Sequence, residues 1–143
     1  VLKSFWGILT KWGFWRNAHR ISFDASVYAM LHLLPEKEQK SAYERLVYES
    51  GRAAFEIGFW YLDPKGAAKV DDTKVTCPVL VIAGAHDRIT PASVVRKVAN
   101  KYKAVSAYEE FEDHAHWIIG EPGWEEVAEY ISGWIDQTFE NKS

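Results

Sequence analysis

Between Pro78 and Ala83 the chain carries only apolar side chains, several of them β-branched. Gly84 ends this run, and a largely polar loop of residues 85–91 follows it directly. A short apolar run that stops at glycine is typical of a strand covered on both faces of a parallel sheet. The pattern therefore predicts a buried strand whose carboxyl end opens into a polar loop.

Helical spacing follows this loop. Thr90 and Pro91 predict a helix start, because a hydroxyl suits the N-cap and proline loses no hydrogen bond at the first helical position. A second strand is predicted at about residues 105–110, and a last helix after residues 121–123. The apolar side chains at helical spacing are Val95, Val98, Ala99 and Tyr102 in the first helix, then Trp124, Val127, Ala128, Ile131, Ile135 and Phe139 in the second. The C-terminal part is thus predicted to be a strand–helix–strand–helix unit with parallel strands.

The first 65 residues or so show helical spacing without a strand pattern. The aromatic segment Val1–Trp15 is too apolar to stand alone, and we expect it to pack against protein rather than lie on a membrane surface. Further helices are predicted to begin at Ser22 or Asp24 and at Pro35, and to span Ala53–Leu62. Short helices therefore precede the strands along the chain.

Residues capable of acid–base chemistry follow both predicted strands. Asp87 lies just past the first strand, and His114 and His116 lie just past the second. Open α/β sheets place their sites at the carboxyl ends of parallel strands. We therefore expect an aspartate and a histidine from these two loops to meet at one edge of the sheet.

The spacing of these residues resembles the C-terminal end of an α/β-hydrolase. The apolar strand runs into Gly84-x-x-Asp87-x-x-x-Pro91, and His116 follows about one strand–helix–strand unit later, with Glu121 five residues beyond it. In that family the triad acid precedes the triad histidine along the chain. The resemblance implies that Asp87 is the acid and His116 the base, with Asp87 accepting a hydrogen bond from Nδ1 of the histidine.

Two alternatives compete with this assignment. His114 is a rival for the base, although the step from His116 to Glu121, which resembles the family's, favours His116. The second alternative is a metal site, whose candidate ligands are His86, Asp87, Asp113, His114 and His116. No second histidine-rich cluster accompanies them, and we expect neither a metal nor another cofactor.

By the same resemblance, residues 1–68 correspond to the family's helical cap and residues 69–143 to the C-terminal part of its core. The predicted fold class is α/β: a partial α/β-hydrolase in which the cap precedes the parallel strands. An apolar substrate pocket beneath the cap would be lined by Trp15, Phe59, Trp60 and Trp117. Core packing is the competing explanation for each of these aromatic residues.

The family's nucleophile sits on a Gly-x-Ser-x-Gly elbow, and none of the nine serines has that setting. Ser50 lies in a helical stretch and Ser132 inside the last predicted helix. The resemblance therefore implies the C-terminal portion of a serine hydrolase for an ester or similar carbonyl bond, inactive by itself. We expect its open strand edge to be covered by the missing N-terminal half or by a second copy, as a homo-oligomer. The alternative function is a non-catalytic self-association or protein-binding module.

The composition of the chain argues against several other classes of protein. The chain has 143 residues, a formal net charge of −3 and no run of basic residues, so a nucleic-acid partner is not expected. No apolar stretch approaches the ~20 residues of a membrane span, and Val1–Trp15 lacks the cleavage site of a signal peptide. The single cysteine, Cys77, adjoins the predicted strand and is expected to be a buried, inert thiol, which fits a reducing, cytoplasmic compartment.

Overall fold

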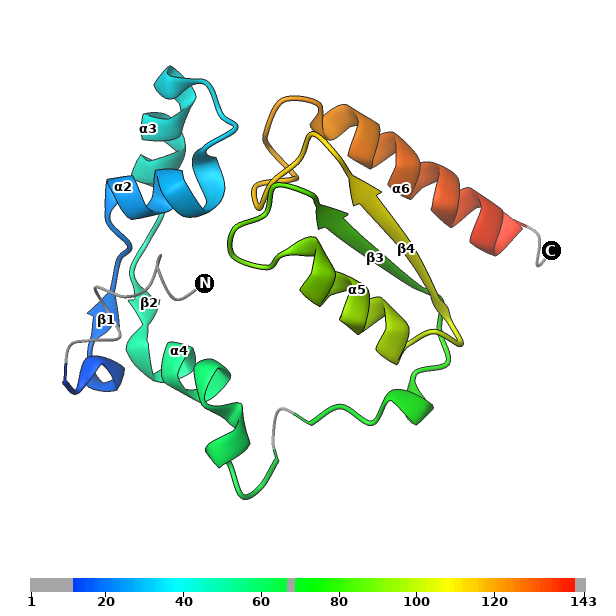
Figure 1. Ribbon diagram of the computed structural model, residues 1–143, viewed down its shortest axis with the longest axis horizontal. Helices are drawn as coiled ribbons and strands as arrows, with labels where there is room; N and C mark the ends of the chain where they lie inside the picture. Colours follow the sequence, from blue (N-terminus) through cyan, green and yellow to red (C-terminus); the bar gives the residue numbers. More distant parts are fainter. Residues whose placement is uncertain (1–11, 67–68, 141–143) are drawn as a thin grey trace.

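The computed structural model describes residues 12–66 and 69–140 of the chain (Figure 1). Residues 12–66 form a mainly helical region, and residues 69–140 contain a small parallel sheet with two helices. Most of the aromatic segment Val1–Trp15 lies outside the described residues. The fold is therefore a mixture of helix and strand, as the sequence predicts.

The N-terminal region consists of short elements joined by tight turns. They are η1 (Phe14–Arg16), β1 (Ala18–His19), α2 (Phe23–Ser26), the π-helical η2 (Val27–Leu31), α3 (Glu36–Arg45), β2 (Glu49–Ser50), α4 (Gly51–Gly58) and η3 (Trp60–Leu62). Ser22 and Ser50 begin α2 and α4 as N-caps, because each side chain accepts a hydrogen bond from a backbone N–H three residues on. The helix predicted over Ala53–Leu62 ends at Gly58 and continues only as the 3₁₀ turn η3.

The expectation that the first 65 residues or so are purely helical is wrong in one detail. The two-residue strands β1 and β2 pair antiparallel, with Ala18 opposite Ser50. Gly51 makes this pairing possible: its N–H donates to the Asn17 carbonyl at 2.9 Å, and a Cβ here would overlap the carbonyl oxygen of Phe14. A contact between segments more than 30 residues apart leaves no local periodicity, so the sequence pattern does not reveal it.

A compact apolar cluster holds the helical region together. Leu31, Leu34 and Ala42 are buried there, and Met30 and Tyr43 pack around them. Trp117, from the C-terminal region, packs against the same cluster. The two regions therefore share apolar contacts next to the loop that carries the predicted histidines.

The C-terminal region has the predicted strand–helix–strand–helix order. After the short turn η4 (Asp72–Lys74), its elements are β3 (Val79–Gly84), α5 (Ala92–Lys101), β4 (Ser106–Phe111) and α6 (Trp124–Phe139). β3 and β4 are parallel, in register from Val79 opposite Ser106 to Gly84 opposite Phe111. The helices α5 and α6 lie on opposite sides of the strand pair, and the carboxyl ends of both strands point toward α2 and α3 (Figure 1).

Two local predictions for this region are wrong. Thr90 is not the N-cap of α5: Pro91 occupies that position with an extended ψ of 143°, and no side chain caps the helix. Cys77 is exposed, because it precedes β3 and lies beyond the cover of the helices. The stripe of α6 is only partly covered, with Val127 buried but Phe139 51% exposed, because a two-stranded sheet is too small to cover a 16-residue helix.

Within the described residues, no helix combines the length and the apolar character that crossing a membrane requires.

Candidate functional site

Asp87 lies in the loop that follows β3, and backbone groups fix its carboxylate. Its N–H donates to the Gly84 carbonyl at 3.1 Å, which closes a turn at the end of the strand. Its Oδ1 accepts hydrogen bonds from the N–H groups of Ile89 at 2.7 Å and Thr90 at 2.8 Å. These donors stabilise the negative charge and hold Oδ1, so that Oδ2 is left for another partner.

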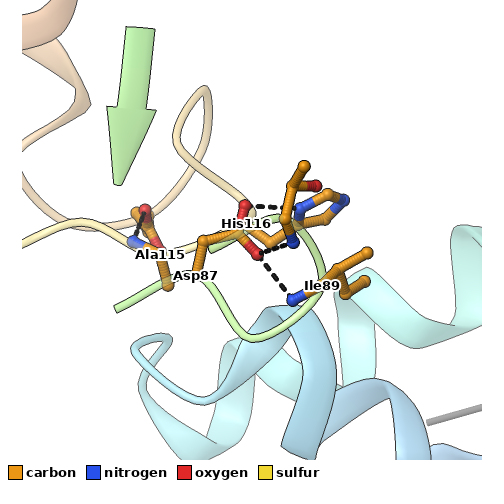
Figure 2. A network of polar contacts seen from close by, with 6 residues as sticks. Asp87, Ile89, Ala115 and His116 are labelled. Carbon is orange, nitrogen blue, oxygen red and sulfur yellow. Dashed lines mark hydrogen bonds and ion pairs between the residues drawn. The ribbon is translucent and has the colours of Figure 1, made fainter. Parts of the chain in front are cut away.

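That partner is His116. Its Nδ1 lies 2.9 Å from Oδ2 of Asp87, and Figure 2 shows the carboxylate held between the Ile89 N–H and this ring. Because an ionised carboxylate can only accept, Nδ1 is the donor in neutral histidine and Nε2 carries the lone pair. The His116 side chain is 34% exposed and that of Asp87 is 9% exposed, so the pair opens to solvent on the histidine side. The predicted contact between these two residues is confirmed.

His114, the predicted rival, faces the other way. Its side chain is 3% exposed, and its Nδ1 lies 3.2 Å from Oε1 of Glu121. The same oxygen accepts a hydrogen bond from the Ala115 N–H at 2.6 Å. The structure therefore pairs His116, and not His114, with Asp87.

The loop that carries both histidines lies directly against the end of β3. The His86 N–H donates to the His114 carbonyl at 2.8 Å. A Cβ on Gly84 would lie 2.6 Å from the same oxygen and closer still to the Ala115 carbonyl. Only glycine leaves room for this approach, which brings His116 within reach of Asp87.

The four predicted pocket residues lie in different surroundings. Trp15 and Phe59 both contact Phe55, with ring centroids 5.6 Å and 4.8 Å apart, respectively. Trp15 and Phe55 border a shallow groove of about 790 Å³ on the N-terminal region, together with side chains of β2, α4 and the η1–β1 segment. Trp60 is 60% exposed, and Trp117 packs against the Leu31 cluster. Tertiary packing thus separates residues that the sequence grouped by type alone.

His32 lies near the pair, and no sequence pattern points to this residue. Its Nδ1 is buried without a hydrogen-bond partner in the described structure. Burial lowers the pKa of His32, the positive charge of Arg88 lowers it further, and the carboxylates of Glu121 and Asp87 act in the opposite direction. The N-terminal region therefore places an imidazole with a lowered pKa within the electrostatic reach of the Asp87 loop.

Arg88 connects this loop to the N-terminal region. Its Nη1 donates to the Tyr28 carbonyl at 3.1 Å, and its guanidinium lies 4.9 Å from the centroid of the Tyr28 ring. Because Arg88 follows Asp87 directly, the contact ties η2 to the loop that holds the carboxylate. A single arginine in the sequence does not indicate which distant residue it will contact.

Among residues 12–66 and 69–140, no three histidine, cysteine, aspartate or glutamate side chains are arranged to hold a metal ion.

No protein-family model, curated protein or solved structure matches this chain. What bears on function is therefore the geometry of the Asp87–His116 pair: a carboxylate fixed by backbone donors, a histidine oriented by that carboxylate, and a second ring nitrogen left to exchange a proton.

Proposed function

We propose that this chain is the C-terminal portion of a serine hydrolase with the α/β-hydrolase fold, acting on an ester or similar carbonyl bond. In this proposal Asp87 and His116 are the acid and base of the catalytic triad. The observation that supports it most is the 2.9 Å contact between Nδ1 of His116 and Oδ2 of Asp87. It joins loops at the carboxyl ends of two parallel strands, the edge at which α/β sheets place their sites.

The proposed chemistry follows from the two ring nitrogens of His116. With Nδ1 donating to Asp87, Nε2 can take the proton of a hydroxyl while that oxygen attacks a carbonyl carbon. The imidazolium formed is stabilised by the Asp87 carboxylate, and Nε2 then returns the proton to the leaving group. The hydrogen bonds from Ile89 and Thr90 keep the carboxylate in place during this cycle.

This function requires a nucleophile and an oxyanion hole from elsewhere. In the described part of the chain, the ring of His116 makes one hydrogen bond, to Asp87, and no hydroxyl or thiol lies within hydrogen-bond distance of Nε2. Ser22 and Ser50 serve as N-caps, and Ser106 donates to the Ala99 carbonyl. We infer that the serine belongs to the N-terminal half of a hydrolase, and that residues 12–66 act as the cap above the completed site.

Co-expression tests the proposal. The chain alone is expected not to hydrolyse a p-nitrophenyl ester above the buffer rate, whereas a complex with a hydrolase N-terminal half carrying the Gly-x-Ser-x-Gly elbow is expected to be active. His116→Gln and Asp87→Asn should each lower that activity by about 10³–10⁴-fold, because the triad members act as a unit. His114→Gln serves as the comparison for the rival histidine. An active complex whose rate does not depend on His116 would refute the assignment.

Exposed apolar residues support a second candidate, a non-catalytic self-association module. Trp12 is 95% exposed, and Ile57, Trp60 and Tyr61 are 75%, 60% and 63% exposed near the end of α4. Exposed groups of large apolar side chains favour association. Light scattering separates the candidates: a dimer or larger assembly without ester hydrolysis in any complex favours the module, and a mass of about 16.4 kDa at micromolar concentration excludes self-association.

A further inference from the structure

Glu121 is a buried carboxylate that the proposed chemistry does not use. It is 1% exposed, and Oε1 accepts two hydrogen bonds, from Nδ1 of His114 at 3.2 Å and from the N–H of Ala115 at 2.6 Å. We call this pair of hydrogen bonds the Glu121 bridge. The other carboxylate oxygen of Glu121, Oε2, is buried without a hydrogen-bond partner in the described structure. Burial of a carboxylate is costly, and the two hydrogen bonds to Oε1 offset part of that cost.

The Glu121 bridge closes the loop that contains His116. Glu121 follows His114 by seven residues, so the bridge joins the two ends of the segment 114–121. Within this segment, the N–H groups of Gly120 and Glu121 donate to the Trp117 carbonyl at 2.9 Å and 3.1 Å. His116 therefore sits in a closed turn, and the peptide N–H of the residue just before it is fixed by a charged acceptor.

The opposite side of this turn is fixed by the end of β3. The His86 N–H donates to the His114 carbonyl at 2.8 Å, and Gly84 lies against the carbonyls of His114 and Ala115. The ring of His114 also lies beside Gly123, where an added Cβ would come 3.4 Å from Nε2. The main chain before His116 is thus held between the Glu121 bridge and the strand that leads to Asp87.

We propose that Glu121 is a positioning residue for His116. The carboxylate touches neither Asp87 nor His116, and acts by fixing the peptide between His114 and Ala115. This inference rests on the proposed function, because it assigns Glu121 the task of keeping the base in register with the acid. The consequence is that the Nδ1–Oδ2 hydrogen bond of the pair depends on a residue five positions further along the chain.

The tautomer of His116 tests this proposal in the full chain. In long-range ¹H–¹⁵N correlation spectra, recorded about two pH units above the ordinary histidine pKa of ~6.5, Nδ1 is expected to appear protonated in the wild-type protein. Glu121→Ala removes the one oxygen that accepts both hydrogen bonds and should shift this signal toward that of an unprotonated nitrogen. Glu121→Gln keeps an amide oxygen for both donors and should preserve the wild-type signal. Glu125→Ala, at an exposed glutamate in the first turn of α6, is the matched control.

Glu121→Asp keeps the test decisive if the alanine variant does not fold. Its shorter side chain retains the charge but cannot reach both donors, so a partial shift of the Nδ1 signal is expected. An unchanged His116 signal in a folded Glu121→Ala or Glu121→Asp protein would overturn the positioning role. Asp87→Asn separates this outcome from failure of the proposed function: if it shifts the His116 signal while the Glu121 variants do not, the pair stands without the bridge, and if it does not, the pair itself is not coupled.

Discussion

The contact between Gly84 and the histidine loop leads to a prediction that depends on space alone. Gly84 is buried at the end of β3 and does not adopt a positive φ, so alanine is compatible with its backbone. Its Cβ, however, would overlap the Ala115 carbonyl oxygen and lie 2.6 Å and 2.7 Å from the oxygen and carbon of the His114 carbonyl. These atoms belong to a main chain held on its far side by Glu121, so they cannot rotate away as a flexible side chain would.

The expected cost of Gly84→Ala follows from what must move. Overpacking a filled site costs about 1–3 kcal/mol, and the hydrogen bond from His86 to His114 contributes about 1 kcal/mol more when the loop is displaced. We therefore expect the free energy of unfolding to fall by about 2–4 kcal/mol. With a urea dependence of about 1–3 kcal/mol per M, the unfolding midpoint should decrease by ~1–2 M with an unchanged slope.

Gly133→Ala is the matched control for this substitution. Gly133 lies inside α6, and a Cβ there would meet nothing within 4 Å. Because alanine favours a helix interior over glycine, this variant should gain about 0.5–1 kcal/mol. A Gly84→Ala protein that loses less than about 0.5 kcal/mol would refute the reasoning, since it would mean that the two loops are not held at the observed separation.

Two further predictions concern charge. Burial and Arg88 lower the pKa of His32 from its ordinary 6.5, so the folded protein binds fewer protons there than the unfolded chain as the pH falls below 6.5. The free energy of unfolding therefore has its full value, with respect to His32, above pH 6.5 and decreases as the pH falls below 6.5. His32→Gln should remove this decrease. Identical pH profiles of the unfolding free energy for both proteins would contradict the effect of burial on this imidazole. Arg52→Ala should leave the unfolding midpoint unchanged, because the side chains of the Arg52–Glu56 pair are 78% and 61% exposed and water screens their attraction; a clear drop in thermal midpoint would show that the pair has a structural role.

The amino-acid sequence by itself determined the elements of the C-terminal region and the edge where the site lies. The apolar run before Gly84 produces β3, the spacing of Val95 and Ala99 produces α5, and the parallel order of the strands follows from the helix between them. Once two strands are parallel, their carboxyl ends share an edge, so the loop of Asp87 and the loop of the two histidines had to lie together there. These conclusions need only the local periodicity of the sequence and the general rule for how a helix connects two parallel strands of one sheet.

Tertiary structure decided which groups touch. His114 and His116 are two residues apart, and only the turn closed by Glu121 and packed on Gly84 directs one ring to Asp87 and the other into the interior. In the same way, packing left Cys77 and Trp60 exposed, paired β1 with β2, and placed the half-buried Trp117 against the Leu31 cluster. Residue type and spacing state what a side chain can do, whereas the direction in which it points depends on loop backbone and on neighbours distant in the sequence.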